Sequence, residues 1–254
     1  QYPFGAHNAY LYGIANRVDK PDEFGVAAKV ELVFGGMEFG AGGLYQKDIA
    51  PSAMLTVSAP LADIDLFAEA VFRYGSDRTF VTESDAPATG YELVTYDDEF
   101  FFNATLGFSF LHTFNEVSSS INLTGQYLFN GEGYDDPSII KEYLGYVTAA
   151  MLVDPDMEIP LTVSDMRQTG KHYTAVGGGW NSIFGSDFSF QLLWMHNYSD
   201  SSGWFSPSIS MAPFDQLTIS LKTPYRYGDG GDEYSPAGES VSIHLGANLG
   251  SGRY

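Results

Sequence analysis

The strongest pattern in the chain is a two-residue alternation from Glu99 to Asn130, which predicts two long β-strands joined by a tight turn. In the first strand every second residue is apolar, namely Phe100, Phe102, Ala104, Leu106, Phe108 and Phe110. The second strand repeats the pattern at Ile121, Leu123, Gly125, Tyr127 and Phe129. Successive side chains of a strand point to opposite faces, so each strand has an aromatic face and a small, polar face. This pattern fits both a soluble sheet and a sheet in a membrane.

The same alternation recurs along the rest of the chain, and with this hairpin it predicts about twelve strands. The further segments are Asn8–Val18, Phe24–Phe34, Met37–Gln46, Ser52–Ala59, Ile64–Tyr74, Lys171–Phe184, Asp187–Tyr198, Gly203–Pro213, Gln216–Tyr227 and Val241–Leu249. One segment differs: Ser138–Leu152 spaces its apolar residues by three and four, which predicts a short helix inside the long loop Gly131–Gly170. A membrane-spanning helix needs about 20 apolar residues, so a membrane protein of this sequence has to cross with strands.

Charged residues on the polar face of Ile64–Tyr74 favour a wet interior. Asp65, Glu69 and Arg73 alternate there with apolar residues. Three charges are costly in a dry core and natural along a water-filled lumen. The residues on the polar faces of the predicted strands are expected to line a lumen. They are Lys29, Glu31, Asp65, Glu69, Arg73, Gln126, Lys222, Arg226 and His244. Those expected to face lipid are Phe100, Phe102, Phe108, Phe110, Tyr127, Phe129, Phe188, Phe190 and Trp194.

The connections between predicted strands alternate in length. Short turns are expected at Gly35-Gly36, Pro60–Asp63, Asn115–Ser118, Gly185-Ser186 and Pro213–Asp215. The intervening connections are on average longer and more acidic. Short turns on one side and long loops on the other, with an even number of strands, are typical of bacterial outer-membrane barrels. An even count places both termini on the short-turn side, which is the periplasm.

With its alternating strands Phe100–Phe114, Ile121–Phe129, Phe188–Tyr198 and Val241–Leu249, the chain resembles the bacterial outer-membrane β-barrel proteins in a porin-like form. The resemblance implies an all-β fold, a closed antiparallel up-and-down transmembrane barrel of about twelve strands, formed by residues 1–254 as one domain. It rests on architecture and not on a family motif. One departure is that such barrels often end on an aromatic residue, usually Phe, whereas Gly250–Arg253 precede Tyr254 here. A lectin-like sandwich also has many alternating strands, but it rarely combines long aromatic faces with this loop asymmetry.

Composition narrows the partners. The chain has 12 Lys plus Arg against 32 Asp plus Glu and a formal net charge of −20, which argues against nucleic acid as a partner. It contains no Cys, which excludes disulfides and thiolate metal sites. The partners that the resemblance implies are outer-membrane lipid and lipopolysaccharide.

The sequence offers no convincing catalytic or metal site. None of the five His has a metalloprotease spacing, and His112 and His196 share the parity of the aromatic faces. Barrel enzymes that hydrolyse lipids place a His and a Ser on one face, whereas Ser199 lies three residues after His196 and so faces the opposite way. Three acidic groups could chelate Ca²⁺ but match no EF-hand loop, and we interpret them as solvated loop surface: Asp97, Asp98 and Glu99; Asp154, Asp156 and Glu158; Asp229, Asp232 and Glu233. We expect no catalytic residue, metal or cofactor.

Three functions fit the sequence to different degrees. The favoured one is a porin-like barrel that passes small hydrophilic solutes passively, with a weak preference for cations because the chain is acidic. The loop Gly131–Gly170 is long enough to fold inward as a constriction. The alternative is a structural or interaction barrel whose long acidic loops dock another envelope or surface protein. A lipid-acting enzyme is the least supported interpretation.

Overall fold

The computed structural model describes residues 2–15, 23–85, 90–114, 116, 118–154, 160–214 and 217–250. Several expected features lie partly or wholly outside these residues. They are the end of the strand Asn8–Val18, the turns at Asn115–Ser118 and Pro213–Asp215, the acidic group Asp154–Glu158 and the C-terminal residues 251–254.

Strands make up most of the described chain. They are β1 Tyr2–Phe4, β2 His7–Ile14, β3 Gly25–Phe34, β4 Met37–Gln46, β5 Ile49–Leu61, β6 Ile64–Tyr74, β7 Phe80–Glu83, β8 Tyr91–Val94, β9 Phe100–Phe114, β10 Ser119–Asn130, β11 His172–Asn181, β12 Phe188–Asn197, β13 Ser202–Phe214, β14 Leu217–Lys222, β15 Tyr225–Tyr227, β16 Ser240–Val241 and β17 His244–Leu249. One α-helix, α1, spans Ser138–Met151, and a short 3₁₀ turn, η2, spans Ile183–Gly185. The predicted all-β fold with a single short helix in the loop after β10 is confirmed for the described residues.

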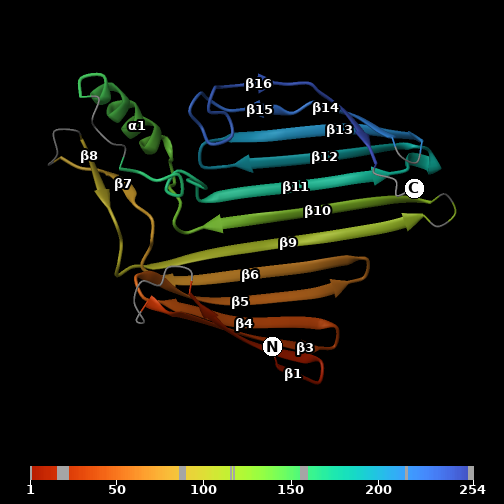
Figure 1. The fold of residues 1–254 in the computed structure, drawn as a ribbon, viewed down its shortest axis with the longest axis horizontal. Coiled ribbons are helices and arrows are strands. Elements are labelled where there is room, and N and C mark those ends of the chain that lie inside the picture. Colours follow the sequence, from red (N-terminus) through yellow and green to blue (C-terminus); the bar gives the residue numbers. More distant parts are fainter. Residues whose placement is uncertain are drawn as a thin grey trace. The chain divides into compact units, whose positions relative to one another are not determined.

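The main sheet is antiparallel and its strands follow one another in chain order. Hydrogen-bonded neighbours run β1-β2-β3-β4-β5-β6-β9-β10-β11-β12-β13-β14-β17 (Figure 1). The register of β3 on β4 ends at Phe34 opposite Met37, which leaves Gly35 and Gly36 as the two turn residues. Both have positive φ, 57° and 85°, as a two-residue hairpin turn requires.

Two parts of the predicted architecture were wrong. The described strands number seventeen, not about twelve, and their hydrogen-bonded order begins at β1 and ends at β17 without a pairing that closes the sheet. The additional strands are β1, β7, β8, β15 and β16. The strand expected to end at Tyr227 is interrupted after β14, where Pro224 has no N–H to donate to a sheet. A separate two-stranded sheet, β7-β8, forms within one of the longer connections between the predicted strands.

The chain divides into two compact units, and each is described by itself. Unit 1 comprises Gln1–Ala59, Phe67–Leu106 and Leu128–His172, and unit 2 comprises Pro60–Leu66, Gly107–Tyr127 and Tyr173–Tyr254. The expectation of a single domain therefore stays a prediction.

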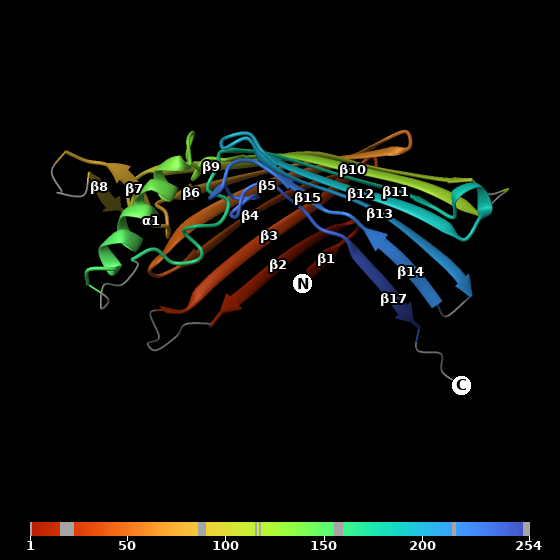
Figure 2. The same cartoon turned by 90° about the horizontal axis from the view of Figure 1, so that it is seen from above.

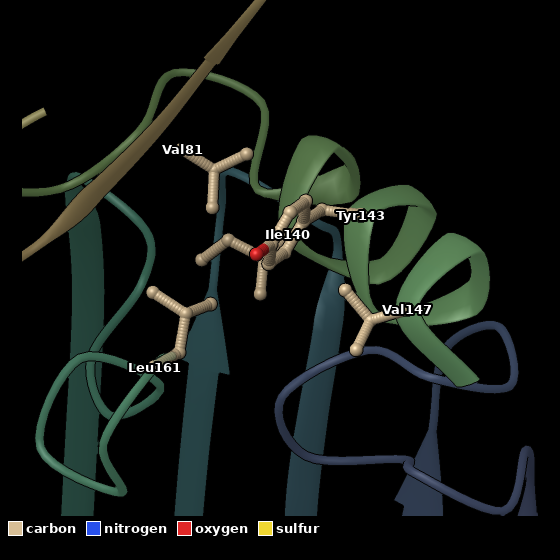
Figure 3. Close-up of a cluster of buried hydrophobic side chains, with 5 residues drawn as sticks. All are labelled: Val81, Ile140, Tyr143, Val147 and Leu161. Atoms are coloured by element: carbon tan, nitrogen blue, oxygen red, sulfur yellow. The ribbon is translucent and has the colours of Figure 1, made fainter. Parts of the chain in front are cut away.

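Unit 1 carries a small hydrophobic core away from its long strands. Ile140, Tyr143 and Val147 are spaced by three and four and are buried on one face of α1. They meet Val81 of β7 and Leu161 (Figure 3). We call α1, β7, β8 and residues 160–170 the loop body; Figure 2 shows α1 beside β7 and β8. Within the described residues no helix has the length and apolarity to cross a bilayer.

The start of α1 is held by an aspartate and not by a capping side chain at its first position. Asp136 Oδ1 accepts a hydrogen bond from the Ser138 amide at 2.9 Å. This N–H, together with the Ser138 hydroxyl, lowers the pKa of Asp136 from its ordinary value.

The packing of α1 predicts a position-dependent cost for one substitution. Val147 is 1% exposed and Val153 is 89% exposed. Val147→Ala removes buried methyl groups, so we expect it to destabilise the loop body by about 1–3 kcal/mol. Val153→Ala makes the same chemical change at the surface, so its cost should stay below about 0.5 kcal/mol. Hydrogen exchange of the α1 amides measures both, and equal effects would contradict this packing.

Candidate functional site

An ion pair between a partly exposed arginine and a buried carboxylate joins the polar face of β6 to the start of the long loop after β10. Arg73 Nη1 lies 3.3 Å from both carboxylate oxygens of Glu132, whose side chain is 6% exposed. The Ser76 hydroxyl donates a further hydrogen bond to Glu132 Oε1 at 2.6 Å. A buried carboxylate is tolerated only when it is paired and hydrogen-bonded in this way.

The end of β10 continues this polar arrangement. Asn130 is buried, and its amide group donates to the carbonyls of Gln168 at 2.8 Å and Gly170 at 3.1 Å. Asn103 of β9 accepts a hydrogen bond from the Gly131 amide at 2.8 Å. Polar side chains of β9 and β10 thus fix both ends of the loop Gly131–Gly170.

A second arginine ties the far part of this loop to the segment after β6. Arg78 Nη2 donates to the Asp165 carbonyl at 2.8 Å, and Arg78 Nη1 donates to the Glu132 and Gln168 carbonyls. The Asp165 carboxylate accepts the amides of Thr79 at 3.0 Å and Thr162 at 2.7 Å. Burial raises the pKa of Asp165, but hydrogen bonds from Thr162 and Thr79 and the Arg78 charge outweigh it, so the pKa lies below its ordinary value.

These residues surround a cavity of about 670 Å³ that lies wholly within unit 1, which we call the arginine cavity. Three arginines line it, Arg73, Arg78 and Arg167, against two acidic residues, Asp77 and Glu132. The chain contains only six arginines and is strongly acidic, so half of them gather at one cavity. The cavity is therefore the place where unit 1 concentrates positive charge.

The structure brings together some of the residues expected to line a lumen. In unit 1, Lys29 pairs with Glu31 at 2.7 Å, and Tyr10 donates to Glu31 at 2.8 Å. Glu69 borders a smaller cavity of about 210 Å³ together with Glu38. Arg73 lines the arginine cavity. Their exposure to a lumen stays a prediction.

The remaining expected lumen residues belong to unit 2. Lys222 Nζ lies 5.2 Å from the centre of the Trp204 ring, and Lys222 stands opposite His244 in the register of β14 on β17. Arg226 stands opposite Trp204 in the register of β13 on β15. Asp65 and Gln126 are exposed. The predicted set is thus split between the units instead of forming one cluster.

The residues expected to face lipid form chains of aromatic contacts in unit 1. Ring centroids lie 4.9 Å apart for Tyr74 and Phe100, 5.1 Å for Phe72 and Phe102, and 6.1 Å for Phe102 and Phe129. In unit 2, Tyr127, Phe188 and Phe190 are exposed, and Phe108, Phe110 and Trp194 are partly exposed. Their contact with lipid stays a prediction. Interfacial aromatic girdles are a feature of outer-membrane barrels.

His196 lies among aromatic side chains. Its Nδ1 is 3.0 Å from the Tyr227 hydroxyl, which also accepts a hydrogen bond from Trp194 Nε1 at 2.9 Å. The His196 ring packs against Tyr198 at 4.5 Å. This environment fits the interpretation of His196 as an aromatic-face residue and provides no support for a catalytic Ser–His pair.

The acidic loop after β15 is folded onto unit 2. The Glu233 carboxylate accepts hydrogen bonds from Tyr173 at 2.6 Å and Asn197 at 3.2 Å. Burial, followed by the charges of Glu233 and Asp200, raises the pKa of Tyr234 to about 12. Within the described part of the chain, no three acidic or histidine side chains form a group able to hold a metal ion. Asp156 and Glu158 lie outside that part.

Arg78, Arg167 and Glu132 were not among the site residues predicted from the sequence. Each lies in a segment expected to be a polar connection between strands. In such a segment the spacing of apolar residues does not indicate which way a side chain points. The available signal was compositional: Arg78 and Arg167 are two of six arginines, and both stand in loops of an acidic chain.

The hydrogen bonds of Asp165 predict how often the segment around Arg167 opens. Asp165→Ala removes three hydrogen bonds to a carboxylate, so the segment around Arg167 should open more often and trypsin should cut after Arg167 at least tenfold faster. Asp85→Ala, at an exposed aspartate of the same unit, should leave this rate unchanged. Equal rates in the two variants would contradict the anchoring role.

The lowered pKa of Asp165 also predicts a pH dependence. The stabilisation is present above the unfolded-state pKa of about 3.9 and is lost as pH falls through the lower folded-state value. Hydrogen exchange should show the Thr79 and Thr162 amides protected at neutral pH and losing protection below about pH 4. Constant protection down to about pH 2 would be evidence against this ionic anchor.

Comparison with known proteins gave weak similarities. No family model and no curated protein matches the sequence. Among solved structures, the chain is similar to a BenF-like porin from Pseudomonas fluorescens Pf-5, at 10% identity and a TM-score of 0.43, over 95% of this chain and 59% of that chain. It is also similar to a loop L8 deletion mutant of OmpT, an outer membrane protein of Vibrio cholerae, at 10% identity and a TM-score of 0.39, over 88% and 62% of the two chains. A third similarity is to BamA from Haemophilus ducreyi lacking POTRA domains 1–3, at 15% identity and a TM-score of 0.27, over 91% and 42%. The chain thus spans less than two thirds of each solved chain, and none of these similarities assigns it a function.

Proposed function

We propose that the long strands form the membrane-spanning wall of a porin-like protein of a bacterial outer membrane, through which small hydrophilic solutes pass passively. The observation that carries the proposal is the division of the strands into an exposed apolar face and an opposite face that holds charges. On β9, Phe100 is 82% exposed and Leu106 is 63% exposed. On β6, the charged residue Arg73 alternates with the aromatic residues Phe72 and Tyr74.

Exposed apolar surface of this extent is unfavourable in water. Burial of apolar area is worth about 25 cal/mol per Å², and the largest apolar patch of a soluble monomer covers only about 300–600 Å². Large apolar side chains are exposed on β3, β4, β5, β6, β9, β10, β12, β13, β14 and β17. A hydrocarbon environment removes this penalty.

Strand length supports the same proposal. A transmembrane strand needs about 9–11 residues when it is tilted by about 45°. Strands β3, β4, β11 and β12 have 10 residues each, and β5, β6, β9, β10 and β13 have 11 to 15. Each is long enough to cross the hydrocarbon layer.

The finer part of the proposal is a weak preference for cations. The chain has a net charge of −20, and the cavity beside β4, β5 and β6 has Glu38 and Glu69 but no basic residue among its described lining residues. Carboxylates along a narrow wet path attract cations and repel anions.

A second candidate function is that of an interaction barrel, in which the loop body is the surface that docks an envelope or surface protein. It is favoured by one observation, that the loop body has a hydrophobic core of its own and is therefore a defined structure. A folded protein that conducts no ions and co-purifies stoichiometrically with one envelope protein would favour this candidate over the pore.

The location can be tested by fractionation and electrophoresis. We expect the protein to partition with the outer membrane and to migrate differently on a gel before and after heating, because membrane-spanning sheets resist detergent until heated. Recovery in the soluble fraction, with no change of mobility on heating, would exclude the proposed location.

Conductance tests the pore. Folded protein in a planar bilayer should give discrete ion currents, and a KCl gradient should give a reversal potential of the sign expected for cations. Glu69→Lys should move that potential towards anion preference. Glu92→Lys makes the same change of charge in β8, outside the lining of the cavity that Glu69 borders, and should move it much less, because salt screens charges that lie farther from the path. Absence of current from heat-modifiable protein would overturn the pore.

A further inference from the structure

The arginine cavity has a charge opposite to that of the chain around it. Its lining carries three arginines and two acidic residues, an excess of one positive charge, whereas the chain has a net charge of −20. A cavity that only conducts cations has no need of this arrangement. The arginines that line the cavity therefore indicate an anionic ligand, whereas the acidic chain as a whole attracts cations.

The three guanidinium groups differ in how far protein partners satisfy them. Arg73 uses Nη1 for Glu132, and Arg78 uses Nη1 and Nη2 for backbone carbonyls while its charge also acts on the nearby Asp165 carboxylate. The Arg167 side chain is exposed and has no hydrogen bond or ion pair to any described residue. Arginine is suited to binding a carboxylate through two parallel hydrogen bonds. Arg167, supported by Arg78, is thus the group best placed to bind an anion.

The rest of the lining is polar and not apolar. Val163 is its only aliphatic residue among those described, and no described aromatic residue lines the cavity. Asn103 uses its carbonyl oxygen for the Gly131 amide, which leaves its NH₂ group as a donor, and the exposed Asp77 carboxylate is an acceptor. Hydroxyl groups both donate and accept, so they match such a lining, whereas an apolar ligand would leave these groups unpaired.

We propose that the arginine cavity binds a small hydroxylated monocarboxylate, with Arg167 and Arg78 holding its carboxylate and the amide and acidic side chains contacting its hydroxyl groups. The Arg167 charge, which forms no ion pair with any described residue, matches one carboxylate, and a volume of about 670 Å³ admits a ligand of several carbon atoms. The inference rests on the proposed function in that it names a class of solute for the pore. Binding itself does not require transport, so the two can fail separately.

Binding is tested on the folded protein in detergent, by calorimetry at about 0.15 M NaCl with D-gluconate as the probe. D-Sorbitol has the same hydroxylated chain without the carboxylate, and hexanoate has the carboxylate without the hydroxyl groups. We expect gluconate to bind at least tenfold more tightly than either of them. Binding of hexanoate as tight as that of gluconate would overturn the role of the hydroxyl groups, and equal binding of sorbitol would overturn the role of the arginines.

Two substitutions test whether gluconate binds in the arginine cavity. Arg167→Gln removes a guanidinium that makes no hydrogen bond or ion pair with the described residues, so folding should be kept, and gluconate should bind roughly ten- to a hundredfold more weakly. Lys141→Gln removes one positive charge from an exposed side chain of α1 in the same unit, outside the cavity lining, and should leave affinity unchanged. Equal weakening in both variants would show that only the overall charge matters, and no weakening in Arg167→Gln would overturn the site.

The same variants test carboxylate binding and ion conduction separately. Where the protein conducts, gluconate should reduce the KCl current of the parent protein and affect Arg167→Gln far less. Conductance without gluconate binding would reject the arginine cavity as a carboxylate site and leave the pore standing. Gluconate binding without conductance would reject the pore and leave the site standing.

Discussion

The constraint on which the rest of this structure depends is that each long strand carries two incompatible faces. Alternation places aromatic and aliphatic side chains on one side and Lys, Glu, Arg or Asn on the other. Water suits only the second face and hydrocarbon only the first. A sheet of this kind is stable where it separates the two environments. The short turns, the strand lengths of 10 to 15 residues and the paired charges on the polar face are consistent with that single requirement.

The polar face also determines where the long loop lies. Arg73 lies at a polar position of β6, and Asn103 lies at a polar position of β9. Arg73 pairs with Glu132, and Asn103 accepts a hydrogen bond from Gly131, so both have partners at the start of the loop. Removing Arg73 would leave the Glu132 carboxylate buried and without its ion-pair partner, which typically costs about 3–5 kcal/mol. The loop expected to act as a constriction is therefore attached to the polar side of unit 1, where it completes the arginine cavity. Whether it narrows a path for solutes stays a prediction.

Local periodicity was sufficient to predict most of the regular structure. The aromatic alternation of β9 and β10 and the three-and-four spacing of α1 predicted these elements correctly because each is decided by neighbours in sequence. The predicted closure of the sheet and the predicted number of about twelve strands were wrong, because long-range strand pairing and the interruption before Pro224 depend on tertiary context. The candidate site was predicted only at Arg73. Arg78 and Arg167 lie in irregular segments whose directions are set by carbonyl contacts that no sequence pattern reveals.

The most direct test of the central claim compares the two faces of one strand. The chain contains no cysteine, so a single cysteine introduced at Leu106 or at Thr105 can be labelled uniquely. In protein folded into vesicles, a fluorophore at Leu106→Cys should be quenched by brominated lipid, and Leu106→Cys should react slowly with a charged maleimide. Thr105→Cys, one residue away on the opposite face, should react quickly with the maleimide and escape quenching by lipid. Equal access of water and equal quenching at both positions would contradict a sheet that separates lipid from water.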